Sequence, residues 1–260
     1  MKNILKNLGC FFALALIFSE LCSVNGLNSI DEIKRRGYIK VSTNAEFEPF
    51  EYKDGDKIVG IDVDIAKKIA ESLDVSTDIN DVSFDAVTLE LSSGNCDLAI
   101  AAMSYSDDKA ENVDFSDTYY FAKQAILVPE NSNITSGEQL NGKKLGVALG
   151  FTGDSYCTEN FLDSEIIRYN KSSDAVLDLM NGRVDAVVVD DAPAKKLVRL
   201  SGNKVKMLDE YLFEEGYRIA VPKGNTELLD YINLMLKQMR DSKEIDKIVN
   251  KYVIEAGTPS

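Results

Sequence analysis

The segment from Asp97 to Tyr120 gathers residue types that could do chemistry. The apolar stretch Leu98 to Met103 predicts a buried strand, and a loop with Ser104 follows it. Residues 106–108 then predict the start of a short helical turn that carries Lys109. A hydroxyl, free backbone N–H groups and an ammonium would thus meet beyond the carboxyl end of one strand. Ligands bind at that place in open α/β sheets, and helix starts attract anions. The segment therefore predicts a site for the carboxylate of a small solute.

The second half of the chain repeats this pattern. A polar cluster at 83–87, a glycine and a buried strand are echoed by a cluster at 172–176, Gly182 and the apolar strand Ala186 to Val189. The second strand leads directly into Asp190. If two such units face each other across one cleft, hydrogen-bond donors lie on one side and an acid on the other. The donors would bind the carboxylate of a zwitterion and the acid would bind its ammonium.

Strands alternate with helices along the rest of the first half. A β-rich stretch at 38–42, a hairpin at 52–59 and an amphipathic helix at 63–73 come first. A strand near 75–82 and a helix at 84–91 lead into the central segment. This alternation predicts the α/β class, with a largely parallel sheet covered on both faces.

Composition excludes several classes of protein. The 260 residues are 45% hydrophobic and 28% charged, which is enough for one large core or two smaller ones. A net charge of −14 without any basic run argues against nucleic-acid binding. Because the chain has no His, nucleophile systems that use His and His-ligated metal sites are excluded. No catalytic residue, metal or cofactor is predicted.

Residues 1–26 have the pattern of a signal peptide. Lys2 and Lys6 supply a positive start, and residues 8–18 form an apolar run too short to span a bilayer. Export to the periplasm or beyond the membrane is therefore expected. The alternative is lipid attachment at Cys22, although the residues before it match a lipoprotein signal poorly.

After removal of residues 1–26, the chain keeps Cys96 and Cys157. Two cysteines in an exported protein could form a disulfide, but both lie in segments that read as internal, in different halves of the chain. Two buried thiols are the favoured interpretation. No other segment approaches the length of a membrane span, so the mature chain is expected to be soluble.

Four separated stretches occur in order along the chain: STNAEFEPFEYKDGDKIVGIDVDIAKKIA, DLAIAAMSYSDDKAENVDFSDTYY, GVALGFTGD and GRVDAVVVDD. They resemble the extracellular solute-binding proteins of polar amino acid ABC transporters, family 3, and the likeness runs from about Ile30 to Val253. The resemblance implies a periplasmic-binding-protein-like II fold. Its two α/β lobes have mixed, mostly parallel sheets and are joined by two crossover strands, and they close over the solute like a flytrap. Lobe 1 would take 27–121 and 218–260, and lobe 2 would take 122–217. The crossovers are expected near 121–123 and 216–218.

The resemblance implies ligand-binding positions in the first lobe. Phe47 and Phe84 match the aromatic residues that stack on the ligand. Ser104 matches a hydroxyl that binds the α-carboxylate, and Ala101 and Ala102 match positions that contribute backbone groups. On residue type alone, the two phenylalanines are also typical of ordinary core aromatics.

In the second lobe, Thr152 matches another carboxylate donor and Asp190 matches the acid that binds the α-ammonium. Two residues depart from the family pattern. Lys109 stands where the family usually has Arg, and Phe151 stands where a smaller hydroxyl residue is common. Lysine offers a point charge in place of a bidentate grip, and losing one charge-assisted hydrogen bond costs roughly 1 to 3 kcal/mol. Phe151 would narrow the pocket or add stacking. Asn44 occupies the place of an acid in relatives that take basic amino acids, which disfavours strict selection of Lys or Arg.

The sequence therefore predicts a monomeric receptor and not an enzyme. It would bind an L-amino acid or a related small carboxylate and deliver it to an ABC transporter permease. Membrane contact would come only through the permease or a lipid at Cys22. Two alternatives remain: a ligand-sensing or host-surface module, and an enzyme like the cyclohexadienyl dehydratases that would use Glu46 or Asp191 as a general acid. Asp191 is otherwise interpreted as a helix N-cap, because Pro193 follows it closely.

Overall fold

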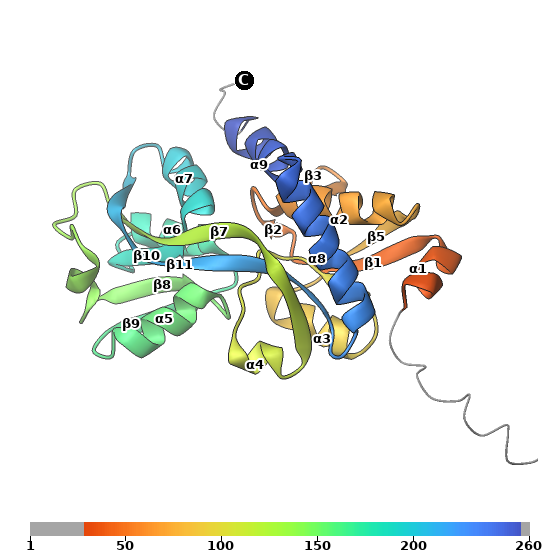
Figure 1. The fold of residues 1–260 in the computed structure, drawn as a ribbon. Coiled ribbons are helices and arrows are strands. Elements are labelled where there is room, and N and C mark those ends of the chain that lie inside the picture. The colour runs from red at the N-terminus through yellow and green to blue at the C-terminus, as the bar shows by residue number, and fades with distance from the viewer. Residues whose placement is uncertain (1–28, 256–260) are drawn as a thin grey trace, which may run out of the picture.

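The computed structural model describes residues 29–255, so the predicted signal peptide and Cys22 lie outside the described residues. Figure 1 shows two α/β lobes side by side, with two long strands running through both. These strands are β7 (Val113–Pro129) and β11 (Val205–Pro222). The two-lobed α/β architecture that the sequence predicts is confirmed.

The first lobe combines the N-terminal part of the chain with the C-terminal helices. Its strands are β1 (Tyr38–Thr43), β2 (Glu46–Phe47), β3 (Glu51–Asp54), β4 (Lys57–Val59), β5 (Ser76–Asp81) and β6 (Leu98–Ala99). Its helices are α1 (Ile30–Arg36), α2 (Ile61–Ser72), the 3-10 turn η1 (Phe84–Ala86), α3 (Val87–Ser92), α4 (Asp107–Ala110), α8 (Thr226–Asp241) and α9 (Glu244–Glu255).

The second lobe is formed by the middle of the chain. Its strands, apart from the two long ones, are β8 (Lys144–Ala148), β9 (Glu165–Tyr169) and β10 (Ala186–Asp190). Its helices are the 3-10 turn η2 (Gly137–Leu140), α5 (Thr152–Asn160), α6 (Ser172–Met180) and α7 (Asp191–Leu200).

One mixed sheet runs through both lobes in the order β5-β1-β6-β11-β7-β10-β8-β9. Pairing is parallel within β5-β1-β6 and within β10-β8-β9, and it is antiparallel where β11 and β7 join the two parts. β11 pairs with β7 from Val205 opposite Pro129 to Pro222 opposite Val113. The predicted crossovers meet, since Gly216 lies opposite Phe121. The lobe boundaries at these residues stay a prediction.

Side chains alternate between the two faces of the sheet, and both faces are covered. On β7, Ile126 and Val128 pack into one apolar cluster of the second lobe, whereas Ala125 and Leu127 pack into another. This period of two is the geometry of a strand buried on both sides. Cys157 lies in the first of these clusters and is a buried thiol, as predicted.

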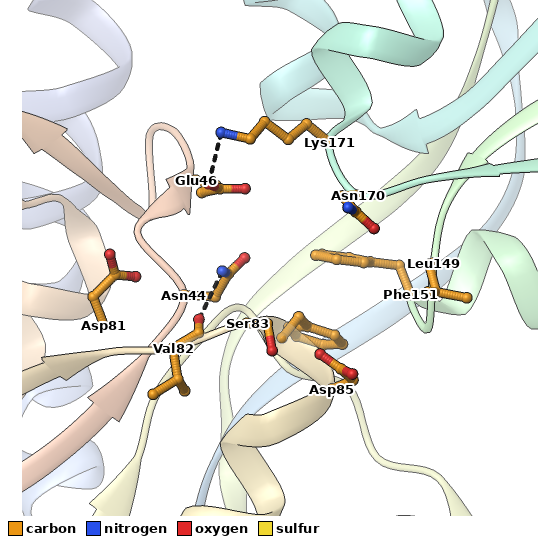
Figure 2. A pocket seen from close by; sticks show the side chains of 11 residues that line it. Asn44, Glu46, Asp81, Val82, Ser83, Asp85, Leu149, Phe151, Asn170 and Lys171 are labelled. Atoms are coloured by element: carbon orange, nitrogen blue, oxygen red, sulfur yellow. Dashed lines mark hydrogen bonds and ion pairs between the residues drawn. The ribbon is translucent and has the colours of Figure 1, made fainter.

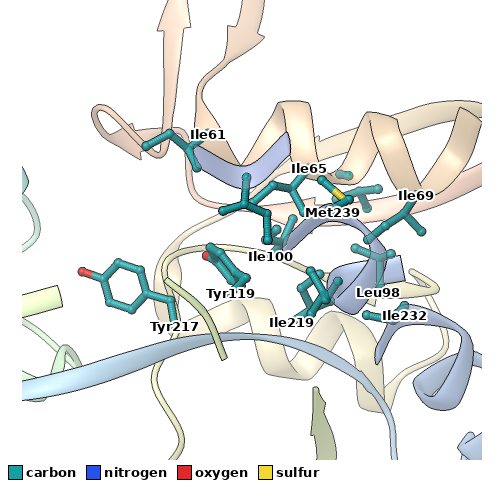
Figure 3. Packing of buried hydrophobic residues seen from close by; sticks show 14 of the residues in the cluster. Ile61, Ile65, Ile69, Leu98, Ile100, Tyr119, Tyr217, Ile219, Ile232 and Met239 are labelled. Atoms are coloured by element: carbon teal, nitrogen blue, oxygen red, sulfur yellow. The ribbon is translucent and has the colours of Figure 1, made fainter. Parts of the chain in front are cut away.

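The core of the first lobe depends on α2 and α8 (Figure 3). Ile61, Ile65 and Ile69 are spaced by four residues, so they share one face of α2, and all three are fully buried. They belong to the same cluster as Ile232 of α8 and Leu98 of β6. Burying this face supplies most of the helix stability that local propensity lacks. Cys96 is buried in a separate cluster of this lobe, so the two thiols are far apart in the fold, as predicted.

Two local predictions are wrong in detail. The strand expected over 98–103 covers only Leu98–Ala99, because the backbone turns at Ala102, which has a left-handed φ of 45°. The following residues stay buried but leave the strand ladder. Helix α7 begins one residue earlier than expected, so Asp190 takes the N-cap position and Asp191 is the first helical residue.

Within residues 29–255, none of the helices combines the length and the apolar character that crossing a membrane would require.

Two glycines near α2 provide a test of how tightly this region is packed. Gly60 precedes α2 with φ 135°, and a Cβ there would lie 2.0 Å from the carbonyl oxygen of Phe50. Gly55 has φ 58° in the β3–β4 turn, with open space around it. We expect Gly60→Ala to lower the free energy of unfolding by roughly 3 kcal/mol or more, because backbone must move. Gly55→Ala should cost about 1 kcal/mol, from backbone strain alone. Urea unfolding of both variants measures the contrast, and equal losses would contradict the close approach of Gly60 to Phe50.

Candidate functional site

Four polar side chains from separate segments meet between the lobes. Ser104 follows β6, Thr152 begins α5, Gln124 lies on β7 and Glu215 lies on β11. Thr152 Oγ1 donates to Glu215 Oε1 over 2.7 Å, and Gln124 Nε2 donates to the same oxygen over 2.5 Å. Ser104 Oγ donates to Glu215 Oε2. One carboxylate thus collects donors from the first lobe, the second lobe and a crossover strand.

Asp190 lies on the other side of the Gln124 amide. Its side chain ends β10, is almost fully buried and accepts a hydrogen bond of 2.7 Å from Gln124 Nε2. Burial raises the pKa of Asp190 well above its ordinary value, and the negative charge of Glu215 raises it further. The Gln124 Nε2 group therefore donates to two carboxylates at once.

The oxygen of the same amide is an open acceptor. Gln124 Oε1 is buried and has no hydrogen-bond partner among residues 29–255. If the Gln124 amide were turned over, this oxygen would face the carboxylates of Asp190 and Glu215, which are also acceptors. The two hydrogen bonds from Nε2 therefore determine the orientation of the amide. A buried acid beside an unpaired amide oxygen is an arrangement that suits an ammonium.

Three phenylalanines close the same space. Phe151 stacks on Phe84 with ring centroids 4.1 Å apart and the planes 19° apart, and it contacts Phe47 at 5.2 Å. Phe47 and Phe84 come from the first lobe and Phe151 from the second. The loop of Phe151 is held by Asp154, which accepts from Gly150 N over 3.2 Å. The aromatic positions predicted for the ligand are therefore in contact with a ring of the protein.

A cavity of about 500 Å³ opens beside these rings (Figure 2). Its polar lining comes from Asn44, Glu46, Asp81, Asp85, Asn170 and Lys171. Lys171 of the second lobe pairs with Glu46 of the first over 2.7 Å. The Asn44 amide donates to the carbonyl oxygen of Val82 over 2.9 Å, so this bond holds it against its own lobe. Carboxylates outnumber ammonium groups in this lining.

A second ion pair crosses between the lobes. Lys196 on α7 pairs with Glu48, which lies in the loop after β2. Together with the Glu46–Lys171 pair, it links β2 and the loop after it to the second lobe. Partly exposed pairs of this kind contribute little to stability, so they set orientation more than energy.

Lys109 is not among the groups that surround Glu215. It lies in α4, and its ammonium donates to Ser106 Oγ over 3.3 Å. The hydrogen bonds to Glu215 come from hydroxyl and amide groups, so the structure does not bring the predicted ammonium into this set.

Ala101 and Ala102 are buried beneath the site. The Ala102 N–H donates to Asp62 Oδ2 over 2.7 Å, so its hydrogen bond lies inside the lobe. Tyr119 also donates to Asp62, over 2.8 Å. Burial raises the pKa of Asp62 to about 6, against the opposing effect of these donors. Glu51 lies beside it, and burial followed by the charge of Asp62 raises the Glu51 pKa well above its ordinary value.

Ser104 and Thr152 are joined through Glu215, and Gln124 joins Glu215 to Asp190. Phe47 and Phe151 line a small cavity with Gln124 and Asp190, and Phe84 adjoins this group by stacking on Phe151. Their roles toward a ligand stay predictions.

Sequence reasoning missed Gln124 and Glu215. Each lies beside a predicted crossover, and Gln124 is a polar residue directly before the apolar run Ala125 to Val128. A polar residue in a strand buried on both faces needs a partner, and that signal could have marked Gln124. Nothing in the sequence marks Glu215 above its neighbour Glu214.

A polar site enclosed between two α/β lobes, which two long strands connect, defines a class: a two-lobed solute-binding protein. The profile of the bacterial extracellular solute-binding proteins, family 3, matches residues 39–255. The chain belongs to this family.

Similar proteins agree with this assignment. The arginine-binding extracellular protein ArtP of Bacillus subtilis is 32% identical, over 92% of this chain and 94% of that protein. A probable histidine-binding protein of Neisseria gonorrhoeae is 29% identical, over 98% of each chain. The crystal structure of a mutant of ArgBP from T. maritima superposes with a TM-score of 0.79 at 38% identity, covering 86% of this chain and 98% of that one.

The raised pKa of Asp62 predicts a pH-dependent stability. The folded state binds a proton at Asp62 more tightly than the unfolded state, so this stabilisation is complete below about pH 4 and lost as pH rises through about 6. We expect the free energy of unfolding of the wild type, relative to Asp62→Asn, to fall by about 3 kcal/mol across that range.

Asp64, on the same helix, provides the matched control. Its pKa is lowered, since hydrogen bonds from Lys251 and Tyr252 outweigh its partial burial. Asp64→Asn should therefore differ from the wild type by a constant amount over the same pH range. Urea unfolding at several pH values measures both differences. A pH-independent difference for Asp62→Asn would contradict the assignment.

Proposed function

We propose that this chain captures an L-amino acid between its lobes and hands it to the membrane permease of an ABC transporter. The observation that carries the proposal is the arrangement of hydrogen-bond donors and acceptors around Gln124. The hydroxyl donors Ser104 and Thr152 lie on one side of the amide, and Asp190 with the open Gln124 oxygen lies on the other. Hydroxyls suit a ligand carboxylate, and an acid suits an ammonium. Because the two hydroxyls belong to different lobes, a ligand held by both favours the closed arrangement.

We also infer that the side chain of the ligand is cationic. The cavity beside the aromatic rings is lined by Glu46, Asp81 and Asp85, with Lys171 as the cation of the lining. Lys171 pairs with Glu46, and Lys53 pairs with Asp81 over 2.6 Å, so Asp85 is the carboxylate of this lining that no ion pair among residues 29–255 neutralises. Phe84 and the ring stacked on it add aromatic faces, which attract cations. Two of the similar proteins are named for arginine and histidine binding, which supports this class. Asn44 is expected to disfavour strict selection of Lys or Arg, so the negative charge offered to the ligand side chain comes from Asp85.

The proposal includes the location of the protein. Residues 1–26 direct export and are removed, and the mature chain works as a monomer on the outer side of the membrane. Lipid attachment at Cys22 is the alternative means of retention. The lobes divide at residues 121/122 and 217/218, and capture of the ligand needs no cofactor.

Binding without turnover is favoured over an enzymatic role. The two candidate general acids are each engaged by a lysine: Glu46 by Lys171, and Asp191 by Lys195 over 2.6 Å. A sensing role would use the same cleft, and co-purification with a receptor in place of a permease would identify it.

A thermal-unfolding screen tests the ligand class. Protein stripped of ligand by unfolding and refolding would be mixed with L-arginine, L-lysine, L-histidine, L-glutamine, L-glutamate or agmatine at millimolar concentration. A ligand present at about a thousand times its dissociation constant adds about 4 kcal/mol of stability. We expect the cationic amino acids to raise the melting temperature and L-glutamate to leave it unchanged. Agmatine, which is arginine without the carboxylate, should be much weaker. A response to L-glutamate as large as to L-arginine would refute the cationic class, and silence from every amino acid would refute the function.

A pair of neighbouring acids tests the ammonium site. Asp190→Asn removes the buried carboxylate at nearly constant shape, and we expect L-arginine affinity in calorimetry to fall about a hundredfold or more. Asp191→Asn makes the same charge change one residue away, where the carboxylate faces Lys195. It should keep affinity within a few fold. Circular dichroism and melting temperature show whether both variants are folded. Near-normal affinity of a folded Asp190→Asn would remove Asp190 from the site.

A further inference from the structure

The donors that suit a ligand carboxylate already hold a carboxylate of the protein. Ser104 and Thr152 both donate to Glu215, one to each oxygen, and Gln124 adds a third donor over 2.5 Å. Each hydroxyl has a single hydrogen to donate. A ligand carboxylate therefore cannot use these hydroxyls while Glu215 keeps them.

The contact also spans both lobes. Ser104 belongs to the first lobe, Thr152 opens α5 of the second, and Glu215 lies on the crossover strand β11, opposite Ala122 of β7. Glu215 thus connects the same two surfaces that the ligand carboxylate would connect. Lys109 is directed to Ser106, so among residues 29–255 the cation that lines the cavity beside Glu215 is Arg218.

We propose that Glu215 is an internal competitor for the carboxylate of the ligand. Its side chain occupies the carboxylate donors and holds the lobes together until an amino acid displaces it. The proposal rests on the function proposed above for the identity of the competing ligand, but the occupied donor set is a property of the chain itself.

The structure offers the displaced side chain a destination. A cavity of about 300 Å³ lies against Ser104, Thr152, Glu215 and Arg218. The Arg218 guanidinium makes one long hydrogen bond of 3.4 Å, from Nη1 to Ser116 O. An arginine has five N–H donors, so Arg218 has donors left to receive the Glu215 carboxylate inside this cavity. Release from the hydroxyls is then coupled to a new ion pair on the same strand.

The competition determines which ligands succeed. Affinity for any carboxylate is reduced by the fraction of protein in which Glu215 still holds the donors. A ligand with further attractive groups, such as the ammonium at Asp190 and a cationic side chain at the acidic cavity, overcomes this loss, whereas a simple carboxylate does not. Glu215 is therefore a specificity-determining residue that excludes small organic acids.

Rescue by acetate tests whether Glu215 fills a carboxylate site. Glu215→Ala leaves Ser104, Thr152 and Gln124 without their acceptor, and we expect its melting temperature to rise by several degrees with sodium acetate at tens of millimolar. Sodium chloride at equal ionic strength should not produce this rise. The wild type and Glu214→Ala, whose side chain is exposed on the same strand, should respond to the two salts alike. Equal responses of Glu215→Ala to acetate and chloride would overturn the proposal.

Affinity for L-arginine tests the competition. Glu215→Gln keeps the shape but makes a weaker acceptor, so calorimetry should show binding about tenfold tighter than in the wild type. Glu214→Gln carries the same charge change and should bind as the wild type does. Affinity of Glu215→Gln equal to or below that of Glu214→Gln would overturn the competitor role. Acetate rescue without any amino-acid binding would instead refute the proposed function, while leaving the occupied carboxylate site in place.

Discussion

The antiparallel pairing of β7 with β11 is the constraint on which the rest of this structure depends. These two strands contribute to the sheet of both lobes, so they fix how the lobes face each other. Their register sets Ala122 opposite Glu215, which brings Glu215 within reach of Gln124. An isolated antiparallel bridge to Tyr217 of β11 places Ser104, and the end of β10 places Asp190, beside the same pair of side chains. A slip of one residue between β7 and β11 would leave Gln124 and Glu215 on opposite faces of the sheet, and the polar cluster would be lost.

Burial of carboxyl groups is the main energetic cost of this architecture. Glu51, Asp62 and Asp190 are almost fully buried, and burial is the largest cause of the raised pKa of each. Donors such as the Ala102 N–H, the Tyr119 hydroxyl and the Gln124 amide offset part of that cost. Interiors retain such groups only where they are hydrogen-bonded. After burial and the neighbouring Asp62, the charge of Asp190 also raises the pKa of Glu51, so the acids of the cleft and of the first-lobe core are electrostatically coupled.

Three features at the cleft are related. Lys109 is directed to Ser106, Phe151 stacks on the aromatic positions, and Glu215 takes the hydroxyl donors. For each of these positions the family resemblance implies a contact with a ligand. Phe151 and Glu215 occupy such contacts themselves, and Lys109 is turned away from its own. The effect of lysine in place of arginine on affinity stays a prediction. The hydroxyls are satisfied within the protein, so the arrangement is stable without a cation at this position.

What the sequence alone determined is local. The alternation of strands and helices and the strand that ends at Asp190 follow from periodicity and residue type, because these depend on neighbours a few positions apart. Even there, the strand after Leu98 is shorter than its apolar run, since Ala102 turns to donate to Asp62, forty positions away. The partners of Glu215 were decided only by the tertiary structure. Ser104 and Glu215 are 111 positions apart, and they meet because the register of β11 against β6 and β7 places them together. No local pattern distinguishes Glu215 from Glu214, because only the pleat of the assembled sheet directs one side chain into the cleft and the other to solvent.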